Sequence, residues 1–365
     1  MSSSDHKFYN AFNLIPQIGP ARFKKLGAYF GAMESAWNAG AGEYAEAGLE
    51  KDAIEKILEN RKTISPEAEF EKLEKAGIKI VTAKDDLYSK LLLETHGAPA
   101  LLYYRGEMKK DELAIAIVGS RKFSIYGRQV AEQFARELSQ AGLVIISGMA
   151  LGIDGVAHRE CLKLKNRTVA VLGSGVDLNS IYPSTNRQIA DEIISGGGAI
   201  VSEYPIGTPP LKQHFPARNR IISGLSLGVL IVEAAESSGA LITAKFALEQ
   251  NREVFAIPGN IYSKTSQGTN NLIKLGAKLA TKAEDIIEEL NLESAKETKK
   301  AREIIPDNEE EKILLENLSP AEPIHIDQLA KKTKMNVTAV SSLLTLMEIK
   351  GKVKNVGGMR YIISN

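Results

Sequence analysis

The sequence predicts an α/β protein organised around a doubly wound parallel sheet, with a small helical domain before the sheet and a winged-helix domain after it. Between about residues 110 and 260, continuous apolar runs alternate with helical stretches. Residues 8–63 contain short helical patterns, and residues 309–365 combine three helical patterns with two short strands. A chain of 365 residues is long enough for two or three such domains.

Residues 1–64 are predicted to form the helical domain, of the SAM or helix-hairpin-helix type. Pro16, Gly19 and Pro20 lie between two apolar helical stretches. A hairpin of this kind can offer backbone amides to a phosphate, because glycine lets the main chain come close. It serves equally well as a plain corner between two helices, and this structural role is the favoured interpretation.

Residues 65–290 are predicted to form the sheet domain, which opens with a helix from Pro66 to Lys75. Apolar strands separated by helices indicate a parallel sheet that is covered on both faces. Ligands of such sheets bind outside the carboxyl ends of the strands. The predicted strands are residues 78–82, 100–104, 114–117, 144–146, 169–172, 199–201, 229–232 and 254–257, with helices such as 127–140 and 243–250 between several of them.

Small residues follow most of these strands. A small residue lets the backbone approach a ligand, and Ser-Ser-Gly before a helix offers N–H groups and a positive dipole end to an anion. Arg121 lies in the first of these turns, so we expect an anion-binding cleft at this edge of the sheet. The small residues are Gly119 and Ser120, Ser147 and Gly148, Gly173 to Gly175, Ser202, Ser237 to Gly239, and Gly259.

The stretch from His214 to Ser226 reaches the same edge between two strands. It carries Phe215, Arg218, Asn219 and Arg220. A guanidinium group binds phosphate oxygens, an amide reads the polar edges of bases, and an aromatic ring offers a stacking face. The alternative is a helix start whose arginines pair with carboxylates. The neighbouring strand ends favour the binding interpretation.

The sequence lacks the motifs that bind several common ligands. Arg121 occupies the place of the middle glycine in GxGxxG, and the next strand of the core ends in Ser147 rather than an acidic residue, which argues against a dinucleotide site. Residues 259–265 partly match the P-loop motif GxxxxGK[ST], but Ser263 lies in the region where the motif requires its second glycine. The five histidines lack metal-ligand spacing. We therefore expect no cofactor and no metal.

Three carboxylates, Asp154, Glu203 and Glu233, lie at strand ends. They could act as a general acid and base. They could also be ion-pair partners for the arginines of the cleft, and this second role is favoured because no nucleophile or metal ligand accompanies them. The site is therefore expected to bind rather than to catalyse.

Composition narrows the class of protein. The formal net charge of +1 rules out a global basic field, so a nucleic-acid site must be a local patch. The single cysteine, Cys161, excludes an internal disulfide and is expected to be a small core residue. The N-terminus lacks the features of a signal peptide, and no apolar run is long enough for a membrane span. A cytoplasmic location is expected.

Residues 291–308 are polar and mixed in charge, as is typical of a linker. Residues 309–365 then predict a winged helix, with helices over 311–318, 326–332 and 337–350 and strands over 353–356 and 359–363 around Gly357-Gly358. The third helix has no arginine in its opening turns, and it has no side chain there, other than Asn336, that could bind a base through two hydrogen bonds. Reading of the major groove is therefore not expected, and the domain is predicted to make protein contacts or weak phosphate contacts.

Taken together, the motifs resemble those of the bacterial DNA-processing protein A family (DprA, also called Smf). The resemblance is strong over residues 110–290 and looser in the flanking domains. The matching residues are Gly119 to Arg121, Ser147 to Ala150 with Gly152 to Asp154, Phe215 and Pro216 with Arg218 to Ser226, Glu233 and Ala234, Ser238 and Gly239 with Leu241 to Ala244, Phe255 and Ala256 with Pro258 and Gly259, and Gly268 to Asn270.

This resemblance implies an extended Rossmann-like domain that binds single-stranded DNA, dimerises, and helps to load the recombinase RecA on DNA taken up in natural transformation. It implies no enzymatic activity. Phe215 is the stacking candidate. The residues expected to bind DNA are Gly119, Ser120, Arg121, Ser147, Gly148, Lys212, Phe215, Arg218, Asn219, Arg220, Ser238 and Gly239.

Two other functions stay open at this stage. A nucleotide-processing enzyme that hydrolyses nucleoside monophosphates would need Glu203 or Glu233 to reach a sugar-bearing ligand. A transcription regulator would act through the winged helix, and the missing base-reading side chains on its third helix count against that function.

Overall fold

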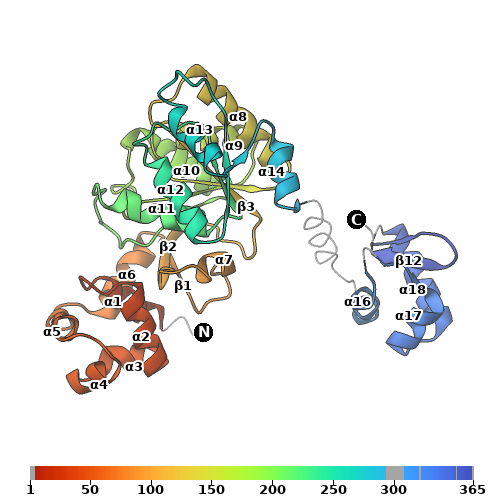
Figure 1. Ribbon diagram of the computed structural model, residues 1–365. Helices are drawn as coiled ribbons and strands as arrows, with labels where there is room; N and C mark the ends of the chain where they lie inside the picture. Colours follow the sequence, from red (N-terminus) through yellow and green to blue (C-terminus); the bar gives the residue numbers. More distant parts are fainter. Residues whose placement is uncertain (1–4, 293–307, 320–321, 351, 364–365) are drawn as a thin grey trace. The chain divides into compact units, whose positions relative to one another are not determined.

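The computed structural model describes residues 5–292, 308–319, 322–350 and 352–363. The chain divides into two compact units, Met1–Ile286 and Ile287–Asn365 (Figure 1). The boundary predicted between residues 64 and 65 lies inside the first unit and stays a prediction. Most of the linker predicted over residues 291–308 lies outside the described residues.

The first unit is built on a nine-stranded sheet with the strand order β1-β2-β6-β5-β4-β3-β7-β8-β9. All neighbouring strands from β6 to β9 in this order are parallel. The chain builds the sheet outward from β3 to β6 and then crosses to the other side of β3 to begin β7, so the strand order reverses beside β3. The strands are β1 (Lys79–Thr82), β2 (Leu101–Gly106), β3 (Ala114–Val118), β4 (Val144–Ser147), β5 (Thr168–Val171), β6 (Ala199–Ser202), β7 (Gly228–Ile231), β8 (Glu253–Ala256) and β9 (Lys278–Leu279).

One edge of the sheet departs from the all-parallel expectation. β2 runs antiparallel to β6, with Tyr103 opposite Ser202, and β1 runs antiparallel to β2, with Thr82 opposite Leu101. The strands themselves were predicted, but not their direction, because an apolar run has the same pattern when it is read from either end. The two-residue strand β9 was not predicted at all, since both of its side chains are exposed.

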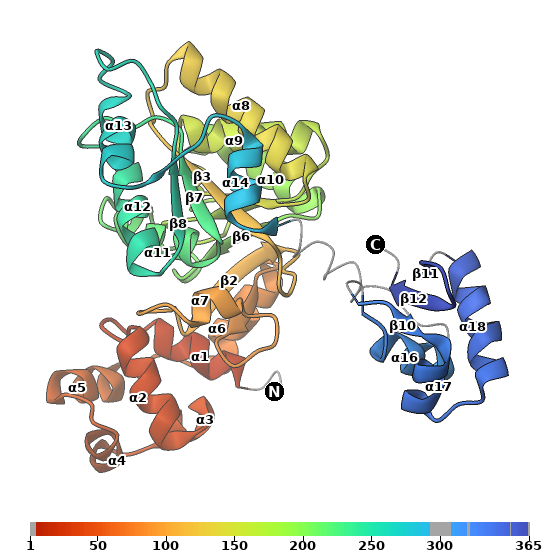
Figure 2. The same cartoon turned by 45° about the vertical axis from the view of Figure 1, so that its right-hand side comes forward.

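Helices cover both faces of the sheet. In Figure 2, α11 and α12 lie on one side of the strands, and α8, α9 and α10 lie on the other. The first face is lined by small side chains such as Ala114 and Ala116, which let Ile221 of α11 and Ala244 of α12 pack closely. These helices are α8 (Ile125–Gln140), α9 (Ile153–Lys163), α10 (Arg187–Ser195), α11 (His214–Gly224), α12 (Ala240–Glu249), α13 (Gln267–Lys274) and α14 (Ala283–Glu289), with the short 3-10 helix η1 (Ser184–Asn186).

The N-terminal helices share a buried apolar core with the β1 and β2 edge of the sheet (Figure 1). Phe12 packs edge-on against Trp37 at 5.0 Å, and the buried Tyr103 hydroxyl of β2 donates to Asn10 Oδ1 at 2.8 Å. The predicted corner is present, because α1 ends at Asn13 and α2 begins at Pro20. The helices here are α1 (His6–Asn13), α2 (Pro20–Phe30), α3 (Met33–Asn38), α4 (Ala41–Glu46), α5 (Lys51–Asn60), α6 (Pro66–Lys75) and α7 (Lys90–Leu93).

Cys161 lies fully buried in α9, as a small core residue is expected to do. Burial raises the pKa of its thiol to about 12. The thiol therefore stays protonated and unreactive at neutral pH.

His158, also on α9, is fully buried, and its imidazole is neutral. Its Nδ1 lies 2.8 Å from Thr168 Oγ1, and the Thr168 hydroxyl donates its only proton to Ile145 O. Thr168 must therefore accept from His158, which places the imidazole proton on Nδ1. Burial, with the positive charges of Arg218 and Arg159, lowers the pKa of His158 from 6.5 to about 3.

This lowered pKa predicts a loss of stability in acid. Between pH 6.5 and 3, His158 is protonated in the unfolded chain but stays neutral in the folded chain. The free energy of unfolding is therefore expected to fall by about 1.4 kcal/mol for each pH unit below 6.5 from this group alone. Urea unfolding at a series of pH values checks the slope, and His158→Gln should remove that share of it. An equal slope in both proteins would contradict the assignment.

The second unit is a three-helix domain with a three-stranded sheet in the order β10-β12-β11, which confirms the winged helix. The buried carboxylate of Glu311 accepts from Lys350 Nζ at 3.0 Å and from Lys352 Nζ at 2.6 Å, which ties the first helix to the end of the third. The short strand β10 was not predicted. The elements are α16 (Glu309–Glu316), β10 (Ile324–His325), α17 (Ile326–Thr333), α18 (Val337–Ile349), β11 (Val353–Asn355) and β12 (Arg360–Ile363).

Candidate nucleic-acid interface

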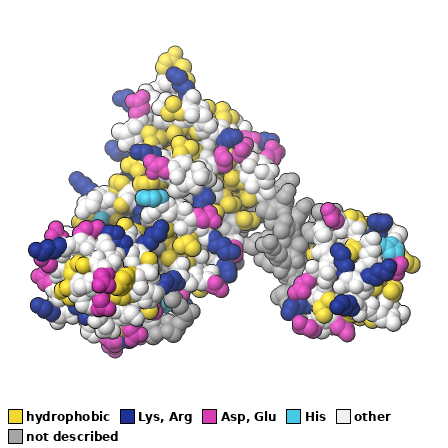
Figure 3. Space-filling view, turned by 60° about the horizontal axis from the view of Figure 1, so that its bottom comes forward, with side chains coloured by type: hydrophobic (Ala, Val, Ile, Leu, Met, Phe, Trp, Pro, Cys, Tyr) yellow, Lys and Arg dark blue, Asp and Glu magenta, His cyan; other side chains and the backbone are white. Residues whose placement is uncertain are grey.

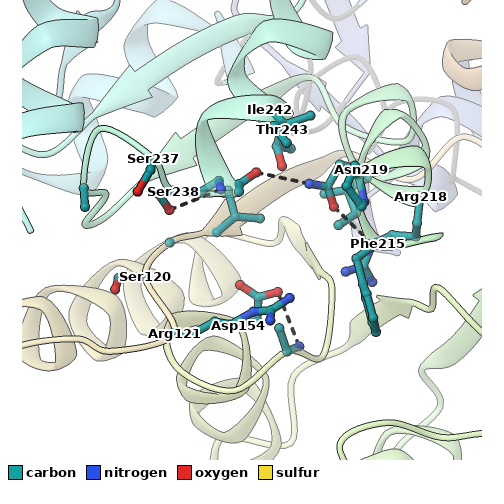
Figure 4. A pocket seen from close by; sticks show the side chains of 18 of the residues that line it. Ser120, Arg121, Asp154, Phe215, Arg218, Asn219, Ser237, Ser238, Ile242 and Thr243 are labelled. Atoms are coloured by element: carbon teal, nitrogen blue, oxygen red, sulfur yellow. Dashed lines mark hydrogen bonds between the residues drawn. The ribbon is translucent and has the colours of Figure 1, made fainter. Parts of the chain in front are cut away.

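A cavity of about 920 Å³ opens at the carboxyl ends of β3 and β7, where the strand order reverses. Three groups of side chains surround it (Figure 4). Arg121 and Asp154 form one wall, Phe215, Arg218 and Asn219 form a second, and the start of α12 forms a third. This is the position at which parallel α/β sheets bind their ligands.

The turn after β3 is held tightly against the neighbouring strand. Ser120 N donates to Glu233 O at 2.7 Å, and Ser120 Oγ both accepts from Lys122 N and donates to Lys122 O. Gly152, at φ +93°, brings the loop after β4 against the same turn, and Ile153 N donates to Ser120 O at 3.2 Å. The backbone therefore fixes where Arg121 leaves the turn, while its side chain stays exposed.

Arg121 and two aromatic rings meet at the cavity. The Arg121 guanidinium carbon lies 5.6 Å from the centroid of the Phe215 ring. The Phe215 ring lies 5.8 Å from the Tyr182 ring, at an interplanar angle of 51°. Arg121 makes no ion pair with any carboxylate of the described residues. A free cation beside two rings suits a phosphate and a base on the same nucleotide.

Arg218 lines the cavity from a buried position, with 3% of its area exposed. Its guanidinium donates to Gly148 O at 2.8 Å, to Val171 O, and to Asn219 Oδ1 at 3.2 Å. Burial lowers its pKa to about 10, which leaves it charged at neutral pH. Arg218 therefore joins the ends of two strands and orients Asn219, and most of its donors are already used.

Asp154 is the carboxylate whose negative charge acts on Arg218. It accepts from Gly148 N at 3.1 Å and from Ala150 N at 3.4 Å. Burial raises its pKa, while the charge of Arg218 and these amides act in the opposite direction. Among the described residues that line the cavity, Asp154 is the one acid, against Arg121, Lys122, Lys212 and Arg218. The cavity is therefore electropositive.

The start of α12 forms the third wall, as the Ser-Ser-Gly sequence predicted. Ser238 Oγ accepts from Ala240 N at 3.3 Å, and Asn219 Nδ2 donates to Gly239 O at 3.3 Å. The second bond connects α11 to the beginning of α12 across the cavity rim. The positive end of the helix dipole adds to the attraction for an anion.

The structure brings nine of the twelve predicted site residues to the cavity and leaves three away from it. Ser147 is buried and donates to Ile117 O at 2.6 Å. Gly148 supports the site from below, since a Cβ there would lie 2.7 Å from Arg218 Cζ. Arg220 points away on α11 and pairs with Glu203. The nine lining residues are Gly119, Ser120, Arg121, Lys212, Phe215, Arg218, Asn219, Ser238 and Gly239.

The two remaining strand-end carboxylates do not line the cavity. Glu203 is the partner of Arg220, as the ion-pair interpretation predicted. Glu233 differs from that prediction, because it accepts from Ser124 N at 2.9 Å, from Ser124 Oγ at 2.6 Å and from Thr265 Oγ1 at 3.0 Å. Its carboxylate joins the start of α8 to the loop after β8 and has a structural role.

Sequence reasoning missed several cavity residues. Lys122 directly follows the predicted Gly-Ser-Arg turn, and its position beside Arg121 was a usable signal. Tyr182 precedes Pro183 in the loop after β5, where an aromatic residue in a polar loop could have been noticed. Thr265 carried no signal, because its place depends on the path of the loop after β8.

Within the described part of the chain, the face shown in Figure 3 carries no large surface of one charge sign. There, Lys and Arg side chains alternate with Asp and Glu side chains over both units. Across the described ranges, no group of three or more His, Cys, Asp or Glu side chains is arranged to hold a metal ion. Within those same ranges, no helix is long and apolar enough to cross a membrane.

Comparison with known proteins agrees with the motifs. A family model described as DNA recombination-mediator protein A matches residues 79–291, and one described as the DprA winged helix domain matches residues 298–359. The protein Smf of Synechocystis sp. is 34% identical over 398 residues, which cover 99% of each chain. The protein Smf of Escherichia coli is 40% identical over 293 residues, which cover 78% of each chain.

Two solved structures are similar as well. DNA processing protein A from Streptococcus pneumoniae has 35% identity and a TM-score of 0.66, over 78% of this chain and 96% of that one. DNA processing protein A from Helicobacter pylori, studied for its single-stranded DNA binding mode, has 31% identity and a TM-score of 0.53, over 60% and 98%. The chain belongs to the DNA recombination-mediator protein A family, whose members are also called DprA and Smf.

Proposed function

We propose that this protein binds single-stranded DNA in the cavity between β3, β7 and α11 and acts in recombination without catalysing a reaction of its own. The observation that carries the proposal is the meeting of the Arg121 guanidinium, which has no carboxylate partner among the described residues, with the Phe215 ring at an electropositive cavity. The single-stranded DNA binding of the Helicobacter pylori relative supports the same ligand.

The chemistry of the cavity suits a flexible single strand. Arg121, Lys122 and Lys212 neutralise phosphates, and the counterions released from the strand make binding depend on salt. Phe215 and Tyr182 stack on bases of any identity, which gives affinity with little sequence preference. A duplex keeps its bases stacked on one another and cannot use these rings, so a preference for single strands follows.

Further parts of the proposed function depend on family membership. We propose that the protein forms a homodimer through its Rossmann-like domain, protects incoming single-stranded DNA in the cytoplasm, and helps to load the recombinase RecA on it during natural transformation. Light scattering checks the dimer. A strand-exchange assay with RecA on DNA coated by single-strand-binding protein checks the loading, and no stimulation by the added protein would contradict it.

The rival activity, hydrolysis of nucleoside monophosphates, has less support from the geometry. Glu203 is engaged by Arg220, and Glu233 by Ser124 and Thr265, and neither carboxylate lines the cavity. Incubation with the common nucleoside monophosphates and chromatography of the products distinguishes the two functions. Release of free base at a rate that depends on protein concentration would favour the enzyme.

Replacing Arg121 with alanine is expected to weaken binding of a thymidine oligonucleotide by about tenfold, since one charged contact to phosphate is lost. The slope of log Kd against log salt should decrease by about one, and Lys212→Ala should behave in the same way. Fluorescence anisotropy at several salt concentrations measures both quantities.

Arg128→Ala is the matched control for this prediction. Arg128 is an exposed arginine on the neighbouring α8, where it pairs with Glu132 at 2.9 Å and does not line the cavity. Binding should be unchanged in that variant. Parental affinity and salt slope in Arg121→Ala would show that the strand binds elsewhere.

A further inference from the structure

The cavity is bordered by an exposed apolar surface that the proposed function does not use. It comprises Phe123, Ile125 and Tyr126 at the start of α8 and Ile261 and Tyr262 in the loop after β8. Tyr262 is 88% exposed, Ile125 80% and Ile261 72%. So many large apolar side chains exposed near one another are typical of a binding surface. We refer to these five residues as the aromatic rim.

The two segments of the aromatic rim are held together and in place. Tyr126 donates its hydroxyl proton to Pro258 O at 2.8 Å. The buried carboxylate of Glu233 accepts from Ser124 in the first segment and from Thr265 in the second. Within the loop, Tyr262 N donates to Asn260 Oδ1 at 2.9 Å and Ser263 N donates to Asn260 O at 2.9 Å. The exposed rings are therefore presented by an ordered backbone.

The aromatic rim is continuous with the cavity. Lys122, which directly precedes Phe123, lines the cavity, and so does Thr265, three residues after Tyr262. A strand that leaves the cavity between these two residues meets the rim next.

The charges around the aromatic rim suit a polyanion. Residues 113–131 and 254–283 contain no Asp or Glu, whereas Lys122 and Lys264 are exposed and make no ion pair among the residues that the structure describes. Glu236, in the loop after β7, is the exposed acid nearest in sequence to the cavity lining, and it does not line the cavity. Lysines beside exposed rings are the combination that single-strand-binding grooves use.

We propose that the aromatic rim is a second contact site for the same DNA strand, in which Tyr262 and Tyr126 stack on bases outside the cavity while Lys264 approaches a phosphate. This inference rests on the proposed function and adds a path for the strand beyond the cavity. Stacking is insensitive to base identity, so the rim extends the footprint on the DNA without introducing sequence preference.

A ladder of thymidine oligonucleotides of increasing length tests the proposal in the full-length protein. Oligonucleotides that only fill the cavity should bind the parent and Tyr262→Ala equally. Longer ones should bind Tyr262→Ala about tenfold more weakly, because one stacked base is lost. Tyr262→Phe should retain parental affinity at every length, because the ring is kept. Tyr29→Ala removes an exposed tyrosine of the N-terminal helices and is the control that should change nothing.

A second readout detects the stacked base directly. Trp37 is the single tryptophan of the chain and is buried, so Tyr262→Trp adds one exposed indole. Long oligonucleotides should quench its fluorescence, and short ones should not. Quenching at no length, or at every length, would overturn the proposal.

The remaining outcomes are distinguishable. An equal effect of Tyr262→Ala on short and long strands, or no effect on either, overturns the second contact while leaving cavity binding intact. A change in oligomeric state without a length-dependent change in affinity assigns the aromatic rim to contacts between copies of the chain and also overturns it. If the parent binds no oligonucleotide, or if Arg121→Ala binds like the parent, the proposed function itself fails, and this inference fails with it.

Discussion

Replacing Arg218 with alanine is expected to lower the free energy of unfolding of the first unit by about 3–5 kcal/mol, because it removes a buried donor of three hydrogen bonds and the positive charge near Asp154. Asp154 would keep its position in the cavity wall without the nearby positive charge. Gly148 O and Val171 O would each lose a donor in a region that water does not reach. DNA affinity should fall as well, since Asn219 loses the bond that orients it.

Chemical unfolding followed by circular dichroism measures this loss. Arg218→Met combined with Asp154→Asn removes both buried charges, and it should recover part of the stability that Arg218→Met alone loses. Lysine cannot replace the fork of the guanidinium, so Arg218→Lys should recover little. A loss below about 1 kcal/mol in Arg218→Ala would contradict the stabilising role assigned to these contacts of Arg218.

Replacing Gly152 with alanine is expected to have the second-largest effect, on stability and DNA binding together. Gly152 has φ +93° and ψ −138°, a conformation that L-residues avoid. A Cβ there would overlap Ser120 O and lie 2.6 Å from Arg121 Cα. The free energy of unfolding should fall by about 3 kcal/mol, from backbone strain and from displacement of a turn that cannot move freely.

Gly239→Ala is the matched control for stability. Gly239 also precedes a helix at the cavity, but its φ is −60°, and a Cβ there meets nothing within 4 Å. Its free energy of unfolding should stay close to that of the parent. In Gly152→Ala, DNA affinity should decrease at least as much as in Arg121→Ala, because the whole turn is moved. Parental affinity in Gly152→Ala would show that the position of this turn does not determine binding.

The central part of the fold was predictable because its strands are buried on both faces. Runs such as Ala114–Val118 and Gly228–Ile231 are apolar throughout, which distinguishes them from exposed strands and places helices on either side. The antiparallel edge was not predictable, since pairing between β2 and β6 depends on distant residues that meet only in the folded chain. β9 is too short and too exposed to produce a pattern.

The candidate site was predictable to the extent that strand ends must meet at one edge of a parallel sheet. What the sequence did not separate were the two arginines of α11. Residues two apart on a helix point in different directions, so Arg218 and Arg220 cannot share one ligand. Phe215, Arg218, Asn219 and Ile222 follow the spacing of one helical face, and all four line the cavity. Arg220 does not belong to that face, so helical spacing by itself is sufficient to exclude it from the site.

The burial of Cys161 has a practical consequence for measuring motion. Its protonated thiol is inaccessible to maleimide reagents in the folded protein, and the chain contains no other cysteine. Cysteines introduced at exposed positions would therefore be the sole sites of dye attachment. Distances between the two compact units could be followed by energy transfer between pairs of such dyes, without first removing a native thiol.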